Sequence, residues 1–376
     1  MAIAPIFKKA YWTLAGAGAS YILTLLLLTN HTLQRHALYL HKVNLGWLQD
    51  LNKPEHFGFS KNQITPFKIP TPDGESLYAW HILPLGLYAQ HEASLLQRPE
   101  GEVEDMTKTE AFELLSKDPE SRLVISFHGN AGTVGQGWRT DTYRSLSSAS
   151  TDKIHVLTID YRGFGYSTGS PSEEALITDG ISTVKWALEV AELPPERIVL
   201  LGQSLGTGVT AAVAEHFATA PLKVEFTGIV LVAGFTDIPG LMLSYSFGGI
   251  IPVLAPLKSY PALQRWFAER MEDTWNTKER ISTLIRVSDR VRLFLIHARN
   301  DRDIPWQHSE ALFHAAANAT SATALSVNAV SDAKEKVDLG DGGSINIWDD
   351  GSNRVVRKEI LRHGGTGYSF AQIPQS

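Results

Sequence analysis

Five short runs of continuous apolar residues punctuate the chain from position 122 onward. They are RLVISF (122–127), IHVLTID (154–160), RIVLLG (197–202), FTGIVLVAG (226–234) and VRLFLIH (291–297). Unbroken Val, Ile and Leu runs bounded by turns are typical of strands that are buried on both faces. Helical patterns separate them, so the alternation predicts an α/β fold built on a mostly parallel, doubly wound sheet.

Other segments fit around this sheet. The stretch ITPFKIPTPDGESLYAWHILP (64–84) alternates apolar and polar residues around Pro-Asp-Gly, which predicts an antiparallel β-hairpin. Residues 88–121 are acid-rich and are expected to form a surface insertion with one helix near 107–115. A second polar insertion, about 328–354, matches no calcium-loop spacing and is interpreted as a solvated hairpin. In SPSEEALITDG, Ser170 is the expected N-cap of a helix that starts at Pro171.

The N-terminal segment is apolar over a length that suits a membrane. No Asp, Glu, Lys or Arg occurs between Lys9 and Arg35, and the eighteen residues from Tyr11 to Leu28 would span about 27 Å as a helix. A cleaved signal peptide is the alternative, but the small residues AGAGAS precede the Leu run rather than follow it. We therefore expect a single-span membrane anchor at 1–35, a linker at 36–60 and a folded domain at 61–376.

The orientation of this anchor has only weak signals in the sequence. Sequons at Asn30 and Asn318 favour a domain on the lumenal side, as in the endoplasmic reticulum.

The composition excludes several kinds of site and partner. Net charge is −6 with acids and bases interspersed, which argues against a nucleic-acid surface. The chain has no cysteine, so disulfides, Cys-ligated zinc and a palmitoyl anchor are excluded. Nothing in the sequence indicates the oligomeric state.

Candidate chemistry begins with LLGQSLGTG (200–208), which follows a predicted strand and opens a predicted helix. A nucleophile elbow holds its serine in a strained conformation, so the positions two residues away must be small. Gly202 and Gly206 satisfy this requirement around Ser204. The alternative interpretation of the motif is an ordinary tight turn between a strand and a helix.

A nucleophilic serine also needs an oxyanion hole. The backbone N–H of Leu205 is one expected donor, and the loop HGNAG after strand 122–127 is expected to supply the N–H of Asn130. Gly129 lets this backbone approach closely. His128 is interpreted as a brace for the loop rather than as a base.

The acid is expected after a later strand. In LFLIHARNDRDIPW, Asp301 lies nearest the strand end, whereas Asp303 is predicted to cap the helix that begins near Pro305.

Together HGNAG, DYRGFGYSTGSPSE, GQSLGTG and D-x-x-I-P resemble the serine α/β-hydrolases over about residues 60–365. More narrowly they resemble the membrane-anchored branch that includes monoacylglycerol and lysophosphatidylserine lipases. The resemblance implies a Ser-Asp-His triad in that chain order, which maps onto Ser204 and Asp301. It also implies a cap over the site, which corresponds to about residues 235–280, and it implies no metal and no organic cofactor.

The resemblance places the catalytic histidine after the predicted last strand, VVRKEIL, where His363 stands. Relatives often use a second histidine after a Gly pair, and Thr366 occupies that position here. The Gly-rich residues after His363 do not predict the closing helix of the family. Three interpretations stay open: His363 is the base on a shifted loop, the end of the chain is altered and inactive, or the protein is a pseudo-hydrolase.

The apolar cap and the membrane anchor favour a lipid-like ester as substrate, cleaved through an acyl-enzyme. The alternatives are a pseudo-hydrolase that serves as an anchored lipid-binding or scaffold protein, and a thioesterase or peptidase of the same fold. The absence of cysteine disfavours thioesterases that are tethered by their own palmitoylation.

Overall fold

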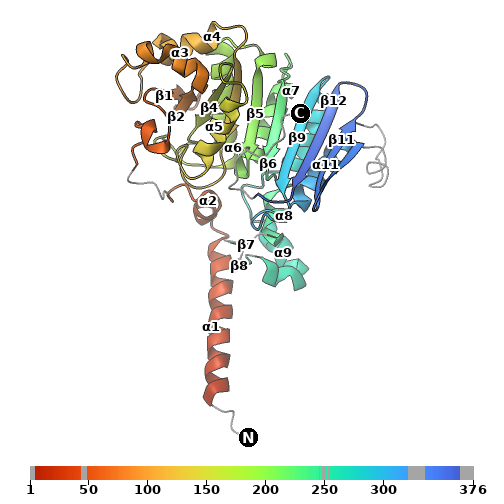
Figure 1. The fold of residues 1–376 in the computed structure, drawn as a ribbon. Helices are drawn as coiled ribbons and strands as arrows, with labels where there is room; N and C mark the ends of the chain where they lie inside the picture. Colours follow the sequence, from red (N-terminus) through yellow and green to blue (C-terminus); the bar gives the residue numbers. More distant parts are fainter. Residues whose placement is uncertain are drawn as a thin grey trace.

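A ten-stranded sheet forms the centre of the domain (Figure 1), in the spatial order β1-β2-β4-β3-β5-β6-β9-β12-β11-β10. The computed structural model describes residues 5–43, 49–244, 246–247, 251–252, 254–320 and 335–364. The strands of the sheet are β1 (Ile64–Pro70), β2 (Ser76–Ile82), β3 (Arg122–Phe127), β4 (Ile154–Ile159), β5 (Ile198–Gln203), β6 (Gly228–Val232), β9 (Val291–Ala298), β10 (Glu335–Gly340), β11 (Gly343–Asp349) and β12 (Arg354–Leu361).

The five apolar runs form the parallel centre of this sheet. Strand β3 pairs in parallel with β4 and β5, β5 pairs with β6, and β6 pairs with β9. Strand β12 continues the parallel part next to β9, while the hairpins β1–β2 and β10–β11 add antiparallel edges. This strand order and parallel pairing confirm the predicted α/β-hydrolase architecture. Continuous apolar strands need cover on both faces of the sheet.

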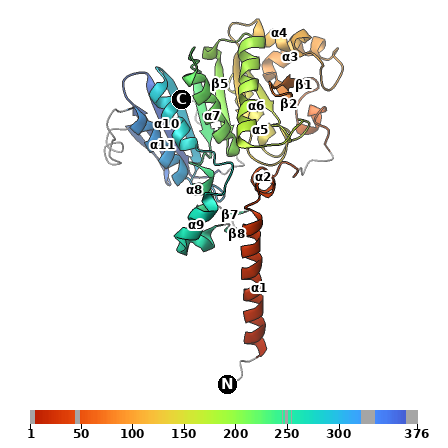
Figure 2. The same cartoon turned by 180° about the vertical axis from the view of Figure 1, so that it is seen from behind.

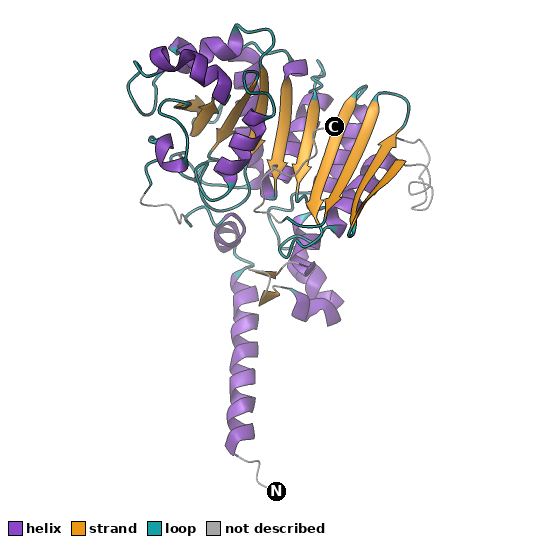
Figure 3. Ribbon diagram, in the orientation of Figure 1, coloured by secondary structure: helices purple, strands orange, loops and turns teal. Residues whose placement is uncertain are grey.

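Helices provide that cover, as Figure 3 shows. The helices α6 (Glu173–Lys185), α7 (Leu205–Thr219), α10 (Thr277–Val287) and α11 (Gln307–Ala319) pack side by side on one face. Helix α5 (Arg139–Ser148) packs against the opposite face at β4. Alternate residues of β3 divide between the two cores: Ile125 belongs to the larger one and Val124 to the smaller.

The segment between β2 and β3 contains α3 (Leu85–Leu95) and α4 (Glu110–Ser116). Helix α4 is the helix that the sequence predicts near 107–115, whereas α3 was not predicted. Both lie at the end of the domain that is remote from the N-terminal helix (Figure 1). This insertion therefore stays away from the edge of the sheet where Ser204 stands.

The segment between β6 and β9, called the cap segment below, contains short elements. It lies at the end of the domain from which α1 (Pro5–Leu27) projects (Figure 2). Its elements before α10 are α8 (Ile238–Ser244), the two-residue strands β7 (Ser246–Phe247) and β8 (Ile251–Pro252), a 3-10 turn (Ala255–Ser259) and α9 (Pro261–Ala268). Leu254, Leu257 and Phe267 form a small separate core there.

The N-terminal helix α1 (Pro5–Leu27) projects from the domain as a rod (Figure 1). Residues Phe7–Leu27 are long and apolar enough to cross a membrane, and their side chains are not buried in the domain. Tyr21 and Leu25 near the end of α1, and Leu28 just after it, pack on the small core of the cap segment. The helix and the cap segment thus lie on the same side of the molecule.

The prediction of a linker at 36–60 needs correction for its described residues. Helix α2 (His31–Tyr39) begins with Asn30 as N-cap and packs against the domain, with Tyr39 fully buried. His41, Leu51 and Phe59 are also buried. Residues 44–48 lie outside the described part of the chain. The pattern of charged and apolar residues in this segment is too short to predict that it packs against the core of the domain.

Two predicted helix caps are wrong. Helix α6 takes Ser172 as its N-cap, whose hydroxyl accepts a hydrogen bond from the N–H of Ala175 at 3.3 Å, rather than Ser170. Helix α11 begins after Trp306 without a side-chain cap, so Asp303 does not play that part. In both cases the helix begins two residues after the proline, at Glu173 and at Gln307.

The predicted final strand is β12, and the polar insertion before it forms the β10–β11 hairpin in its described residues. Residues 328–334 of that insertion lie outside the described part of the chain. So do Thr366 and all residues from 365 onward, including those for which the absence of a closing helix was expected.

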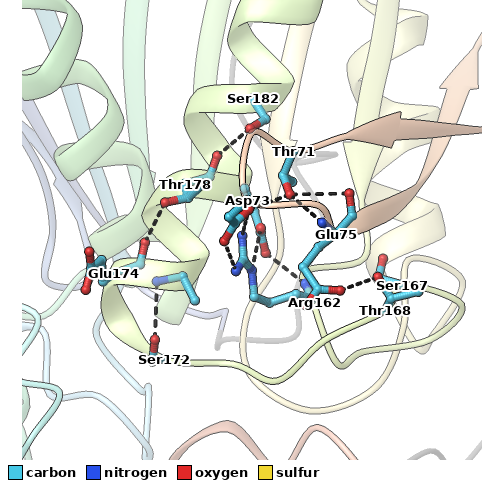
Figure 4. A network of polar contacts seen from close by, with 12 residues as sticks. Thr71, Asp73, Glu75, Arg162, Ser167, Thr168, Ser172, Glu174, Thr178 and Ser182 are labelled. Carbon is cyan, nitrogen blue, oxygen red and sulfur yellow. Dashed lines mark hydrogen bonds and ion pairs between the residues drawn. The ribbon is translucent and has the colours of Figure 1, made fainter.

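The loop DYRGFGYS after β4 is fastened by Arg162 (Figure 4). Its Nη1 donates to Asp73 Oδ2 at 2.6 Å, in the turn of the β1–β2 hairpin. Its Nε donates to Asp179 Oδ1 on α6 at 2.8 Å. The hydrogen bond from Arg162 lowers the pKa of Asp73 to about 2, whereas burial raises the pKa of Asp179 to about 6. This network fixes the loop between the hairpin and α6.

Candidate active site

Ser204 stands at the turn between β5 and α7 in a strained backbone conformation. Its φ is 50° and its ψ is −119°, values that a non-glycine residue rarely adopts. A Cβ on Gly202 would lie 2.2 Å from the Gly206 carbonyl oxygen, and a Cβ on Gly206 would lie 2.0 Å from the Phe127 carbonyl oxygen. Both positions therefore exclude a side chain. This is the geometry of a nucleophile elbow.

The HGNAG loop that follows β3 lies directly against this serine. A Cβ on Gly129 would come within 3.3 Å of the Ser204 Cβ. The neighbouring Asn130 lines the same cavity as Ser204 and Leu205. The structure brings these three residues together, because β3 and β5 are adjacent parallel strands whose C-terminal ends share one edge.

Two backbone N–H groups at this place are available to an oxyanion. Within the described residues, the N–H groups of Asn130 and Leu205 donate no hydrogen bond to the protein. The Leu205 N–H is the first of helix α7, so it has no intrahelical acceptor and lies at the positive end of the helix dipole. The arrangement can stabilise negative charge that develops next to Ser204.

Arg139 holds the other side of this loop and was missed by the sequence analysis. The side chain is buried, and its Nη2 donates to the carbonyl oxygens of Gly129 (3.1 Å), Asn130 (3.0 Å) and Ala131 (2.7 Å). The C=O and the N–H of one peptide point in opposite directions. A guanidinium that binds three successive carbonyl oxygens of the loop therefore directs the N–H groups of the same peptides away from itself. No motif in the sequence marks Arg139, since it lies ten residues beyond Gly129 in an ordinary helix.

His128 lies behind the loop, away from the solvent. Its Nδ1–H donates to the Gly129 carbonyl at 2.6 Å, and its own carbonyl accepts from the Tyr161 hydroxyl at 2.9 Å. Burial lowers the pKa of the imidazole well below its ordinary value. Asp160, whose pKa is raised to about 7 by burial, has Oδ1 3.8 Å from His128 Nε2. These contacts are those of a brace.

Asp301 follows β9 with one carboxylate oxygen used and one open. Its Oδ1 accepts from the N–H groups of Asp303 (2.9 Å) and Ile304 (3.0 Å). Its Oδ2 is buried and has no hydrogen-bond partner among the described residues. Burial raises the pKa of this carboxyl. A fixed carboxylate with one oxygen free is suited to accept a hydrogen bond from an imidazole.

His297 is the imidazole nearest to that free oxygen, at 3.7 Å between Nε2 and Asp301 Oδ2. Its two nitrogens are already bonded to the Ser309 hydroxyl (2.7 Å) and to the Ile304 carbonyl (2.8 Å). The ring is buried, and burial lowers its pKa to about 4. His297 is therefore a structural residue of the turn after β9.

His363 lies on the loop after β12. Strand β12 is the parallel neighbour of β9, the strand that leads to Asp301. The next residue, Gly364, donates its N–H to Asn300 Oδ1 at 2.9 Å, so the two loops are joined beside Asp301. The side chain of His363 is exposed and makes no hydrogen bond with any described residue. The structure thus brings the two loops together without joining the imidazole to the carboxylate.

A cavity of about 440 Å³ opens beside Ser204, with Gly129, Asn130 and Leu205 at its base. The cap segment forms one wall, through the apolar side chains Ile238, Leu241, Met242, Phe267 and Met271. The opposite wall comes from the residues around α2 and was not predicted. It consists of Leu28, Gln34, Ala37, Leu38 and Leu40. The cavity thus lies between the residues around α2 and the segment between β6 and β9.

Comparison with known proteins agrees with this arrangement. Residues 122–270 match the α/β-hydrolase fold family. The chain is 26% identical over 290 residues to lysophosphatidylserine lipase ABHD12 of Danio rerio, covering 77% of this chain and 68% of that protein. It is 27% identical over 287 residues to protein ABHD12B of Homo sapiens, covering 75% and 69%. It is 29% identical over 248 residues to the uncharacterized protein YfhR of Salmonella typhimurium, covering 65% and 72%.

The matched segment begins at β3 and includes the elbow at Ser204, the loop at Asn130 and most of the cap. Fold, elbow and relatives lead to one conclusion: the chain has the α/β-hydrolase fold and is similar to the serine α/β-hydrolases.

Proposed function

We propose that this protein is a serine hydrolase that cleaves carboxylic esters of lipid-like substrates, of the monoacylglycerol or lysophospholipid type. One observation carries the proposal: a strained serine with two free N–H groups beside it stands in an apolar cavity whose walls include Leu28, the residue that follows a helix of membrane length. The relatives named lysophosphatidylserine lipases support the same class of substrate. Long acyl chains match such a cavity because their burial is favourable at every methylene.

The proposed reaction is acyl transfer to water. His363, oriented by Asp301, takes the proton of the Ser204 hydroxyl while Oγ attacks the ester carbonyl carbon. The N–H groups of Asn130 and Leu205 stabilise the tetrahedral oxyanion, and its collapse expels the alcohol, which receives the proton from His363. Water then attacks the acyl-enzyme by the same route and releases the fatty acid.

The cap wall gives a test of the substrate class. We expect Leu241→Trp to lower kcat/KM for a long-chain monoacyl ester by about tenfold while a butanoyl ester changes less than twofold. The reason is that the larger side chain removes room for about two methylenes, each worth about 0.8 kcal/mol when buried. Leu241 is buried in the cavity wall. Hydrolysis of an acyl series from four to eighteen carbons measures the effect.

Leu222→Trp is the matched control, since Leu222 is 87% exposed and lies outside the cavity. It should leave the acyl preference unchanged. An equal loss for short and long esters in Leu241→Trp would contradict an acyl-chain cavity, and so would no loss at all.

A second candidate function is an anchored protein that binds lipids without cleaving them. One observation favours it: the His363 imidazole makes no hydrogen bond with Asp301 or with any other described residue. A fluorophosphonate probe distinguishes the two, because it reacts only with an activated serine. Labelling supports the hydrolase, including thioesterases and peptidases of this fold, and no labelling supports the binding protein.

We also propose that the hydrolase domain faces the lumen of the endoplasmic reticulum. Asn30 and Asn318 each stand in a sequon, and Asn30 is exposed at the end of the membrane-length helix. We expect an endoglycosidase to reduce the apparent mass of the protein from cells, and the reduction to disappear in the Asn30→Gln/Asn318→Gln variant. An unchanged mass of the unmodified chain, with protease access to the domain in intact microsomes, would place it on the cytosolic side.

A further inference from the structure

We infer that the membrane-proximal segment Asn30–Val43 is a clamp that positions the oxyanion loop, and that Tyr39 is its central positioning residue. The inference rests on the proposed function of the Ser204 site and adds a regulator of its geometry. It concerns residues that the sequence analysis had divided between an anchor and a linker.

Three hydrogen bonds join the clamp to the loop. The Ala131 N–H donates to the Tyr39 carbonyl at 2.9 Å, and the Gly132 N–H donates to the Val43 carbonyl at 3.0 Å. The Asn130 side chain donates through Nδ2 to the Leu38 carbonyl at 3.3 Å. Three successive residues of the loop are thus bonded to one short segment.

These bonds act where the loop backbone is unfavourable. Ala131 has φ of 57° and Gly132 has φ of 67°, so two consecutive residues adopt the left-handed region. An alanine in that region is disfavoured by contact between its Cβ and its own backbone, and it persists only when neighbours hold it. The Asn130 N–H belongs to the Gly129–Asn130 peptide, one peptide further from these two residues. Loss of the clamp therefore changes the direction of the proposed oxyanion donor.

The Tyr39 side chain fastens the clamp to the body of the domain. It is fully buried, and its hydroxyl donates to Asp273 Oδ2 at 2.8 Å while it accepts from Trp275 Nε1 at 3.2 Å. Asp273 Oδ1 in turn accepts from the Glu173 N–H at 2.9 Å, at the start of α6. One hydroxyl therefore connects the segment after the membrane helix to the end of the cap and to α6.

The same segment is joined to the membrane helix with little freedom between them. Helix α2 begins at His31, four residues after the end of α1 at Leu27, and Leu28 already lines the cavity. Arg139 holds the carbonyls of the loop from one side and the clamp holds its N–H groups from the other. Seating of α1 and α2 is therefore coupled to the geometry at Ser204.

The test is Tyr39→Phe in the full-length, membrane-embedded protein. We expect kcat for a monoacyl ester to fall about tenfold, with KM changed less than twofold, because the oxyanion donor acts mainly in the transition state. A trifluoromethyl ketone, whose tetrahedral adduct carries an oxyanion, should lose affinity in the same proportion as kcat. A non-hydrolysable ether analogue of the substrate should bind unchanged.

An activity-independent measurement accompanies this one. Hydrogen exchange should show faster deuterium uptake in a peptide covering residues 129–133 of Tyr39→Phe, because the amides of Ala131 and Gly132 lose fixed acceptors. Tyr88→Phe is the matched control: Tyr88 is buried and its hydroxyl donates to the Lys61 carbonyl at 2.9 Å, outside the cavity and the clamp. It should change neither kcat nor exchange in that peptide.

A second variant tests the same contact in case Tyr39→Phe folds poorly. Asp273→Asn keeps the size of the side chain and weakens the bond to Tyr39, so we expect a smaller fall in kcat. The double variant should be no slower than Tyr39→Phe alone. If the kcat losses of the two single variants multiplied in the double variant, the clamp would be overturned. A Tyr39→Phe protein with unchanged kcat and unchanged exchange would also overturn it. An unreactive unmodified protein would instead overturn the proposed hydrolase, while the exchange result would still decide whether the clamp holds the loop.

Discussion

Ser204→Ala is expected to abolish ester hydrolysis, with a loss in kcat of about a million-fold. The hydroxyl is the proposed nucleophile, and the two N–H groups next to it can retain only the small part of catalysis that they supply without an attacking group. The strained turn itself should persist, because the flanking glycines and not the hydroxyl allow it. Hydrolysis of a monoacyl ester and labelling by a fluorophosphonate measure the change.

Ser148→Ala is the control for this result, since Ser148 is exposed on α5 and its hydroxyl donates to the Ser145 carbonyl at 2.8 Å, within its own helix. It should be labelled as strongly as the unmodified chain. Persistent labelling of Ser204→Ala would mean that the probe reacts with another residue, and the elbow would lose its proposed role.

His363→Ala is expected to cause a loss of the same size, about a million-fold in kcat, because removal of the base disables the nucleophile that depends on it. Asp301 Oδ2 is free to accept a hydrogen bond, and the bond from the Gly364 N–H to Asn300 Oδ1 holds the His363 loop beside that carboxylate. Single-turnover hydrolysis, together with the rate of probe labelling, measures the effect.

Asp301→Asn should be less severe, about ten-thousand-fold, since the serine and the imidazole remain and only the orientation of the ring is lost. His56→Ala, which alters an exposed histidine far along the chain from the site, should be neutral. If His363→Ala retained full labelling, the base would have to be sought among other residues, and the interpretation of the loop after β12 would change.

The Ser204 elbow illustrates what local sequence can predict. The strand before it, the helix after it and the two glycines are all local features, and each has a steric reason that can be recognised without coordinates. The parallel order of β3, β5, β6 and β9 then follows from continuous apolar runs and from the short connections of an α/β fold. Asn130, Leu205 and Asp301 could be named because the C-terminal ends of such strands meet at one edge.

Tyr39 and Arg139 illustrate the opposite case. Arg139 acts by collecting carbonyls from a loop ten positions earlier, and Tyr39 acts through Asp273 and Trp275, more than two hundred positions later. Neither residue stands in a motif, and both look ordinary in a list of apolar and polar positions. Backbone carbonyls and N–H groups exist at every residue, so the sequence contains no signal of which of them a distant side chain will meet.

The sequence by itself thus determined the fold class, the elbow, the residues at the strand ends and a helix of membrane length, because each depends on a local pattern or on a steric limit. The tertiary structure decided that the segment after that helix is a wall of the cavity, that its backbone holds the oxyanion loop, and that Ser172 and not Ser170 is the N-cap of helix α6. It also decided that one oxygen of Asp301 stays open beside the His363 loop. These features depend on hydrogen bonds between segments that only the packed chain brings within about 3 Å of each other.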